Sequence, residues 1–235
     1  MKEVPYDKWC DFIEKKLKKY GIDDGLICDL GCGSGTLTTM LSDRGYDMTG
    51  IDSSNEMLQE ALAKKGKRDI LYLGQDIREF ELYGTMRAIV SSCDALNYII
   101  SKNELKKVFR LAANYLDPAG LFIFDIHTSA YYEKLGNNTF SDTTERSAYI
   151  WDNSYDRSTG INEYELTLFT ENPDGSYTRS EEEHMERAYS GVYINKILKG
   201  SGFEILEIKA DYTERNIDDD HDPTDRVVYI TRKLN

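Results

Sequence analysis

Residues 26–35 combine the residue types that bind a nucleoside in a crevice at the end of a β-sheet. The apolar residues predict a buried strand, Asp29 lies near its end, and Gly31, Gly33 and Gly35 follow at alternate positions. A second strand-like run ends in a second acid, Asp52. Glycines let the backbone approach a ligand closely, and a carboxylate in this place can accept both ribose hydroxyls. The order of strand, glycine turn, helix, strand and acid therefore predicts a nucleoside site in a doubly wound sheet.

The spacing of the glycines narrows the choice of nucleoside. A dinucleotide site requires glycine at the first, third and sixth positions of the turn, and the sixth position here is Thr36. The pattern Asp-x-Gly-x-Gly-x-Gly instead resembles the first motif of class I S-adenosylmethionine (AdoMet)-dependent methyltransferases. The later motifs of that family are resembled, in order, by Gly50-Ile51-Asp52-Ser53-Ser54, Gly74-Gln75-Asp76-Ile77, residues 89–94 and residues 116–125.

The resemblance covers the chain nearly end to end and is closest to a bacterial branch of uncharacterised small-molecule methyltransferases with a β-insert. It implies an aromatic lid that precedes the first helix and closes over the cofactor. Because this chain reaches Tyr6 directly after Met1-Lys2-Glu3-Val4-Pro5, we expect the lid to be incomplete.

The resemblance implies which residues surround the methionine part of AdoMet. Asp29 would attract the ammonium group of the cofactor, directly or through water. The residues expected to lie along the methionine moiety and its tail are Gly31, Cys32 and Gly33 in the glycine turn, and Ser92 and Cys93 after the fourth strand.

The adenosine part of the cofactor would lie against the second and third motifs. Asp52 would hold the ribose hydroxyls, and Ser53 or Met57 would pack beside the adenine. Asp76 would accept a hydrogen bond from the adenine amino group, with Ile77 against the ring.

Methyl transfer is an in-line displacement, so the enzyme chiefly binds the cofactor, aligns the acceptor and excludes water. His127, directly after the fifth strand, could deprotonate an amine or a hydroxyl, or it could shape the acceptor pocket or begin a helix. Asp94 and Asn97, beyond the fourth strand, could position a polar acceptor or cap the turn that they occupy. These three residues are the candidates for catalysis.

The acidic run Asp218-Asp219-Asp220-His221-Asp222 contains metal-ligating residue types. Adjacent residues cannot all face one ion, and Pro223 indicates a loop. We therefore interpret the run as a solvated loop, and we expect no metal site.

Composition limits the classes of partner. The 235 residues carry a formal net charge of −13, from 29 basic and 42 acidic side chains, so nucleic acid is disfavoured as a partner. No apolar run is long enough to cross a membrane, and the N-terminus does not resemble a signal peptide. Four cysteines without a disulfide framework favour a cytoplasmic location.

The elements that must position these residues alternate between strand and helix, which predicts a mainly parallel sheet. Strands are expected at residues 26–31, 47–52, 70–74, 87–92 and 120–126, and helices at 6–19, 35–44, 54–65 and 102–115. Ser53 with Glu56 and Ser101 with Glu104 are helix-start signals. Residues 145–188 alternate with period two and predict an antiparallel β-insert, which is followed by a helix at 193–199 and closing strands at 202–206 and 226–230.

The expected fold is thus α/β, a Rossmann-like doubly wound sheet of seven strands with an antiparallel β-insert. The resemblance implies that the last strand is antiparallel. Residues 1–144 and 189–235 would form the AdoMet-binding domain, and the insert would cover the acceptor side. The expected function is methyl transfer to N or O of a small polar molecule. The alternatives are an RNA or protein methyltransferase and a non-catalytic AdoMet-binding regulator. The acceptor, the choice of N or O, and the oligomeric state stay open.

Overall fold

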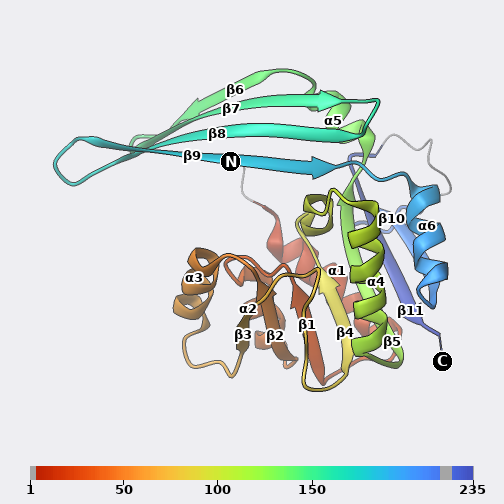
Figure 1. Cartoon of the computed structure of the whole chain (residues 1–235). Helices are drawn as coiled ribbons and strands as arrows, with labels where there is room; N and C mark the ends of the chain where they lie inside the picture. Colours follow the sequence, from red (N-terminus) through yellow and green to blue (C-terminus); the bar gives the residue numbers. More distant parts are fainter. Residues whose placement is uncertain (1–3, 218–223, 235) are drawn as a thin grey trace.

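A computed structural model describes residues 4–217 and 224–234 of the chain. Within these residues the backbone forms two sheets. The larger has seven strands and is flanked by helices, and the smaller is a four-stranded antiparallel sheet that arches over one end of the larger one (Figure 1). The acidic run at Asp218–Asp222 lies outside the described residues. No helix in the described ranges is long and apolar enough to cross a bilayer.

The larger sheet has the strand order β10-β11-β5-β4-β1-β2-β3. Its strands are β1 (Leu26–Leu30), β2 (Asp47–Asp52), β3 (Leu71–Gly74), β4 (Met86–Ser91), β5 (Leu116–His127), β10 (Phe203–Ala210) and β11 (Arg226–Lys233). Pairing is parallel from β3 through β5, and β11 lies antiparallel between β5 and β10. The expected seven-stranded sheet with an antiparallel last strand is confirmed.

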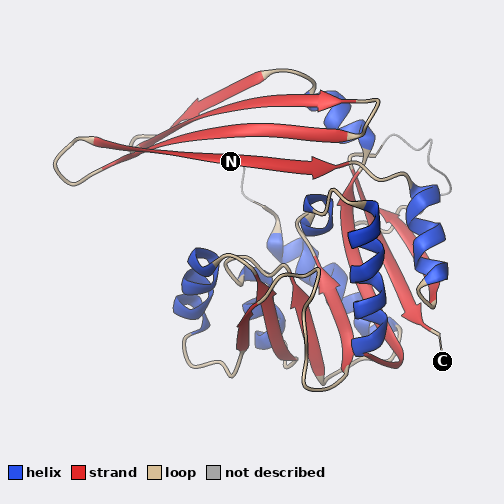
Figure 2. Cartoon of the chain, viewed as in Figure 1, coloured by secondary structure: helices blue, strands red, loops and turns tan. Residues whose placement is uncertain are grey.

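Helices cover both faces of this sheet (Figure 2). They are α1 (Tyr6–Lys19), α2 (Thr36–Asp43), α3 (Asn55–Lys65), α4 (Lys102–Tyr115) and α6 (Gly191–Gly200). The apolar residues of α1 and α2 pack on one face of the central strands, and those of α4 and α6 pack on the other. Because both faces are buried, the central strands are continuously apolar rather than alternating.

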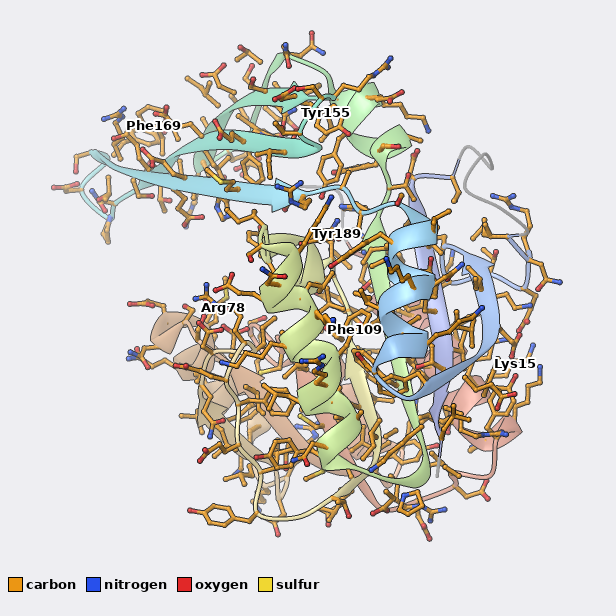
Figure 3. All side chains as sticks on the ribbon, turned by 45° about the vertical axis from the view of Figure 1, so that its right-hand side comes forward. Lys15, Arg78, Phe109, Tyr155, Phe169 and Tyr189 are labelled. Atoms are coloured by element: carbon orange, nitrogen blue, oxygen red, sulfur yellow. The ribbon has the colours of Figure 1, made fainter. Side chains whose placement is uncertain are left out.

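The second sheet follows α5 (Ser129–Leu135) and has the order β6-β7-β8-β9. Its strands are β6 (Thr139–Thr143), β7 (Ser147–Asp156), β8 (Ile161–Glu171) and β9 (Tyr177–Arg187). The sheet begins at Thr139, ahead of the expected boundary at residue 145, because β6 adds an edge strand that is largely exposed. Figure 3 shows Tyr155 at the end of this sheet beside α5 and Phe169 on the overhanging end.

The helix-start signals are borne out at one position and shifted at the other. Ser101 caps α4 by accepting a hydrogen bond from the backbone N–H of Glu104 over 3.4 Å. At α3 the cap is Ser54, which accepts from the backbone N–H of Met57 over 3.2 Å, so the expectation of Ser53 was wrong by one residue.

Candidate functional site

The glycine turn ties the end of β1 to β2. The backbone N–H groups of Gly31 and Cys32 both donate to the carbonyl of Ile51, over 2.8 and 2.9 Å. Gly31 has a φ of +79°, and a Cβ there would lie 2.7 Å from the Cβ of Ala95. A Cβ on Gly33 would meet nothing within 4 Å, so the turn is free of side chains on that side. The turn thus forms a cradle in which backbone can meet a ligand.

Asp52 joins this cradle to the start of α3. Its Oδ2 accepts a hydrogen bond from the backbone N–H of Gly33 over 2.8 Å, and its Oδ1 accepts from that of Ser54 over 2.9 Å. A carboxylate has about four acceptor positions, so each oxygen can still accept a hydroxyl. The two backbone bonds fix the orientation of the carboxylate and leave acceptor positions on both oxygens.

Asp29 lies below the cradle and is buried. Thr38 on α2 donates to its Oδ2 over 2.6 Å. Burial raises the pKa of the Asp29 carboxyl to about 6, although the Thr38 hydrogen bond opposes this shift. A cationic group placed nearby would stabilise the ionised form of Asp29.

The residues expected beside the adenine lie on the rim of the site. Met57 is exposed on the first turn of α3, and Ile77 packs against the core. Asp76 forms an ion pair with Arg78 over 2.5 Å, and this hydrogen-bonded partner lowers the pKa of the Asp76 carboxyl. Arg78 therefore already donates to the carboxylate that is expected to accept a hydrogen bond from the adenine amino group.

The chain turns sharply after β4. Ser92 is buried, and Cys93 and Asp94 both have positive φ angles, of 59° and 52°. Tyr6, the first residue of α1, places its hydroxyl 3.7 Å from the Cys93 Sγ. The start of α1 thus contacts the segment expected to line the methionine tail.

An arginine that was not among the predicted site residues joins Asp94, Asp125 and His127 at the ends of β4 and β5. Arg226 begins β11 and donates to Oδ1 of Asp94 over 2.9 Å and to the buried carboxylate of Asp125. It also donates to Nε2 of His127 over 2.6 Å. Trp9 on α1 covers the guanidinium, with its ring centroid 5.0 Å away. Three residues of the two neighbouring strand ends are therefore held by one cation.

Asn97 is buried in η1 (Ala95–Tyr98), a 3₁₀ helix. Its side-chain amide forms hydrogen bonds with the backbone of two different strands. Its Oδ1 accepts from the N–H of His127 over 3.0 Å, and its Nδ2 donates to the carbonyls of His127 and Arg187 over 3.1 and 2.8 Å. Asn97 therefore connects β5 to the end of β9.

Glu186 on β9 brings the second sheet into the same site. Atoms of Glu186, Asp94 and His127 lie within 4.8 Å of one another, and the hydroxyl of Tyr132 donates to Glu186 Oε2 over 2.8 Å. Burial, reinforced by the charge of Asp94, raises the pKa of Glu186 to about 7. The three side chains are metal-ligating types, but the Arg226 guanidinium donates to Asp94 Oδ1 and to His127 Nε2, so the Nε2 lone pair is not free to bind an ion.

The sequence-predicted residues thus fall into two groups along one edge of the sheet. Asp29, the glycine turn and Asp52 lie at the ends of β1 and β2, whereas Asp94, Asn97 and His127 lie at the ends of β4 and β5. Arg226, Glu186 and Tyr132 also belong to this cluster but were not predicted from the sequence, because they come from distant parts of the chain. No local motif marks them, and only the fold brings them together.

Comparisons with known proteins agree on one class. A family model described as a methyltransferase domain matches residues 27–120. A relative from Geobacillus sp. (strain WCH70), named "Putative methyltransferase", is 33% identical over 238 residues, covering 99% of this chain and 95% of the relative. The crystal structure of an S-adenosylmethionine-dependent methyltransferase from Clostridium acetobutylicum ATCC 824 is 31% identical with a TM-score of 0.91, covering 99% of this chain and 94% of that one. The sugar N-methyltransferase KedS8 from Streptoalloteichus sp ATCC 53650 shares the fold, with a TM-score of 0.79 at 15% identity, covering 98% and 88% of the two chains.

Proposed function

Because the chain belongs to the class I AdoMet-dependent methyltransferases, we propose that it methylates N or O of a small polar molecule. The cofactor is AdoMet, which when bound supplies a methyl group on a positively charged sulfur. The side-chain-free cradle at Gly33 and the oriented carboxylate of Asp52 fit the nucleoside and methionine parts of this cofactor.

The position of the second sheet supports a small acceptor. Glu186 and Tyr164 of that sheet face the ends of β4 and β5, where Tyr164 bonds to Tyr98 over 2.9 Å. The acceptor side is thus roofed by protein, which favours a small molecule over a polymer. In this proposal residues 1–144 and 189–235 hold the cofactor, and the insert covers the acceptor.

In this proposal each predicted site residue has a place relative to the cofactor or the acceptor. Asp29, Gly31, Cys32, Gly33 and Cys93 would contact the methionine part of the cofactor. Asp94 and His127 would face the acceptor, and Asn97 would position His127 through its backbone. Enclosure by the sheet would exclude water from the reacting atoms.

An RNA methyltransferase is the second candidate within enzymes, and charge argues against it. The chain carries a net charge of −13, and the insert that would cover the acceptor exposes the run Glu181-Glu182-Glu183 on β9. A phosphate backbone would be repelled from this surface.

Calorimetric titration with AdoMet and with S-adenosylhomocysteine tests the cofactor site first. The second step measures S-adenosylhomocysteine formed with a panel of amines, sugars, small acids and an unmodified transfer RNA. Turnover with a small compound supports the proposal, whereas turnover with the RNA alone overturns it. Tight binding of the cofactor without turnover on any acceptor would favour a non-catalytic regulator.

A further inference from the structure

We infer that the acceptor is an aliphatic amine, bound as its ammonium ion between Asp94 and Glu186, and that Glu186 accepts the proton that frees the amine. This inference rests on the proposed function and deepens it, because it selects nitrogen over oxygen. It assigns a catalytic role to a residue of the insert.

The carboxylates of Asp94 and Glu186 are near enough for one small cation to contact both, and the inferred binding space lies between them. Asp94 precedes η1, Glu186 lies near the end of β9, and one ligand atom from each lies within 4.8 Å of the other and of His127. The walls are aromatic: Tyr131 stacks on His127 with centroids 3.7 Å apart, and Tyr132 bonds to Glu186. Aromatic faces and carboxylates together form the surroundings that favour an organic cation.

Charge balance gives the same answer. Three carboxylates, Asp94, Asp125 and Glu186, surround this part of the site, and Arg226 bonds to the first two of them. Buried carboxylates without a compensating cation are costly. An ammonium ion placed beside Glu186 supplies the missing positive charge, whereas a neutral hydroxyl does not.

The hydrogen bonds of His127 show why the proton would go to Glu186. An arginine can only donate, so the bond from Arg226 occupies the lone pair of His127 Nε2. The proton of the neutral imidazole is then on Nδ1, which is buried and has no hydrogen-bond partner among the described residues. That Nδ1 lies 3.7 Å from Asp94 Oδ1, on the side of the cluster. His127 can therefore donate a hydrogen bond into the space but cannot accept a proton there.

The groups that face Glu186 come from several elements. They are Asp94, Tyr98 and His127 on the larger domain, Tyr131 and Tyr132 on α5, and Tyr164 on β8. The guanidinium of Arg226 on β11 bonds to Asp94 and His127 of this set. Burial and Asp94 keep the pKa of Glu186 near 7, which makes it a stronger base than an exposed carboxylate.

The proton and the methyl group balance in two steps. In the first, the ammonium ion gives one proton to the Glu186 carboxylate, which becomes a neutral acid, and the amine recovers its lone pair. In the second, the N–C bond forms as the S–C bond of the sulfonium breaks, giving a methylammonium ion and neutral S-adenosylhomocysteine. Glu186 then returns its proton to solvent when the product leaves.

The test uses matched amine and hydroxyl compounds with the full chain. The pairs are cyclohexylamine and cyclohexanol, 2-amino-2-deoxyglucose and glucose, and glycine and glycolate. Each compound is assayed for S-adenosylhomocysteine formation and, separately, for calorimetric binding to the protein saturated with S-adenosylhomocysteine. The variant is Glu186→Gln, which keeps the shape and an acceptor for Tyr132. The control is Glu183→Gln, an exposed residue on the opposite face of the same strand.

We expect at least one amine to bind and react while its hydroxyl partner does neither. Glu186→Gln should lower turnover by about 10²–10⁴-fold, the contribution of a positioned general base, and should abolish the acid limb of the pH–rate profile. It should also weaken amine binding, whereas Glu183→Gln should leave both unchanged. Thermal unfolding of each variant checks that it is folded.

Four results would overturn the inference. Equal turnover of hydroxyl compounds, or an unchanged Glu186→Gln enzyme, would reject it while leaving the proposed function intact. Activity that is lost with EDTA and restored by Mn²⁺ would identify the cluster as a cation site instead. If AdoMet binds but none of the small compounds binds or reacts, the proposed function fails as well.

Discussion

The guanidinium of Arg226 donates a hydrogen bond to Nε2 of His127 over 2.6 Å, across the junction between β11 and β5. Arg226 is directly opposite His127 in the register of these strands, so the contact is set by the antiparallel pairing. Burial also lowers the pKa of His127, so the imidazole is neutral near pH 7. The lone pair of His127 Nε2 is therefore occupied, and the proton of the neutral ring lies on Nδ1. The residue that the sequence suggests as a base can act there only as a hydrogen-bond donor.

Replacing Arg226 should destabilise the protein strongly. Arg226→Ala leaves the fully buried Asp125 without its cation, and breaking such a pair costs about 3–5 kcal/mol. Chemical denaturation measures the loss. Arg232→Ala is the control on the same strand, because its ion pair with Glu204 is exposed and long, at 4.0 Å, and should contribute less than about 1 kcal/mol. Equal losses for the two variants would contradict the role assigned to Arg226.

Removing the Asp52 carboxylate should weaken cofactor binding. Asp52→Ala should cost about 1–3 kcal/mol of AdoMet affinity, the range for hydrogen bonds to a charged group. Calorimetry with S-adenosylhomocysteine gives the same quantity without turnover. Asp47→Ala, at the exposed opposite end of β2, should bind the cofactor normally. Unchanged affinity in a folded Asp52→Ala protein would refute the ribose assignment.

A methyl group at Gly31 should disturb the cradle. Gly31→Ala forces a left-handed φ on alanine, which costs about 1–2 kcal/mol, and places a Cβ 2.7 Å from Ala95. We expect lower thermal stability together with weaker binding of S-adenosylhomocysteine. Gly84→Ala provides the comparison, since a Cβ there meets nothing within 4 Å. Normal binding by Gly31→Ala would show that the turn does not contact the cofactor.

Truncating His127 should affect turnover rather than cofactor affinity. His127→Ala removes the Nδ1 donor and the ring that stacks on Tyr131, while the cradle at β1 and β2 is untouched. Turnover should fall, and S-adenosylhomocysteine should bind as before. The pH–rate profile should keep its acid limb, because the imidazole is not the base. A fully active His127→Ala enzyme would limit the residue to shaping the pocket.

Glu186 should make the unfolding free energy depend on pH. Its pKa is about 7 in the folded protein against 4.5 ordinarily, so the folded state binds the proton more tightly. The resulting stabilisation is complete below pH 4.5 and is lost as pH rises to about 7. Between those pH values the unfolding free energy of Glu186→Gln relative to wild type should rise by up to about 3 kcal/mol. Chemical denaturation of both proteins at pH 4.5 and pH 8 checks this. An equal pH dependence of the two unfolding free energies would contradict it.

The sequence was sufficient to predict the larger sheet because each of its elements has a local signal. Apolar runs mark β1 and β5, and the glycine turn separates β1 from α2. The shifted cap shows the limit of such signals. Ser53 and Ser54 are adjacent and chemically equivalent, and only the backbone conformation decides that Ser54 bonds to Met57.

The parts that could not be predicted depend on contacts between distant residues. Thr139–Thr143 lies at a sheet edge, mostly exposed, so it has no hydrophobic alternation to mark it as a strand. Glu186 and Arg226 follow Asp94 by 92 and 132 residues. Their charges acquire a function only when strand pairing places them beside Asp94 and His127.

The position of β9 at the margin of the second sheet has a consequence for solubility. An unpaired strand can recruit a strand from another molecule and begin aggregation. The outer part of β9 reads Arg179-Ser180-Glu181-Glu182-Glu183, and all five residues are exposed. Another copy that docked along this strand would bring like charges into contact. The exposed acids of β9 therefore disfavour pairing of the overhanging β8–β9 hairpin with another copy.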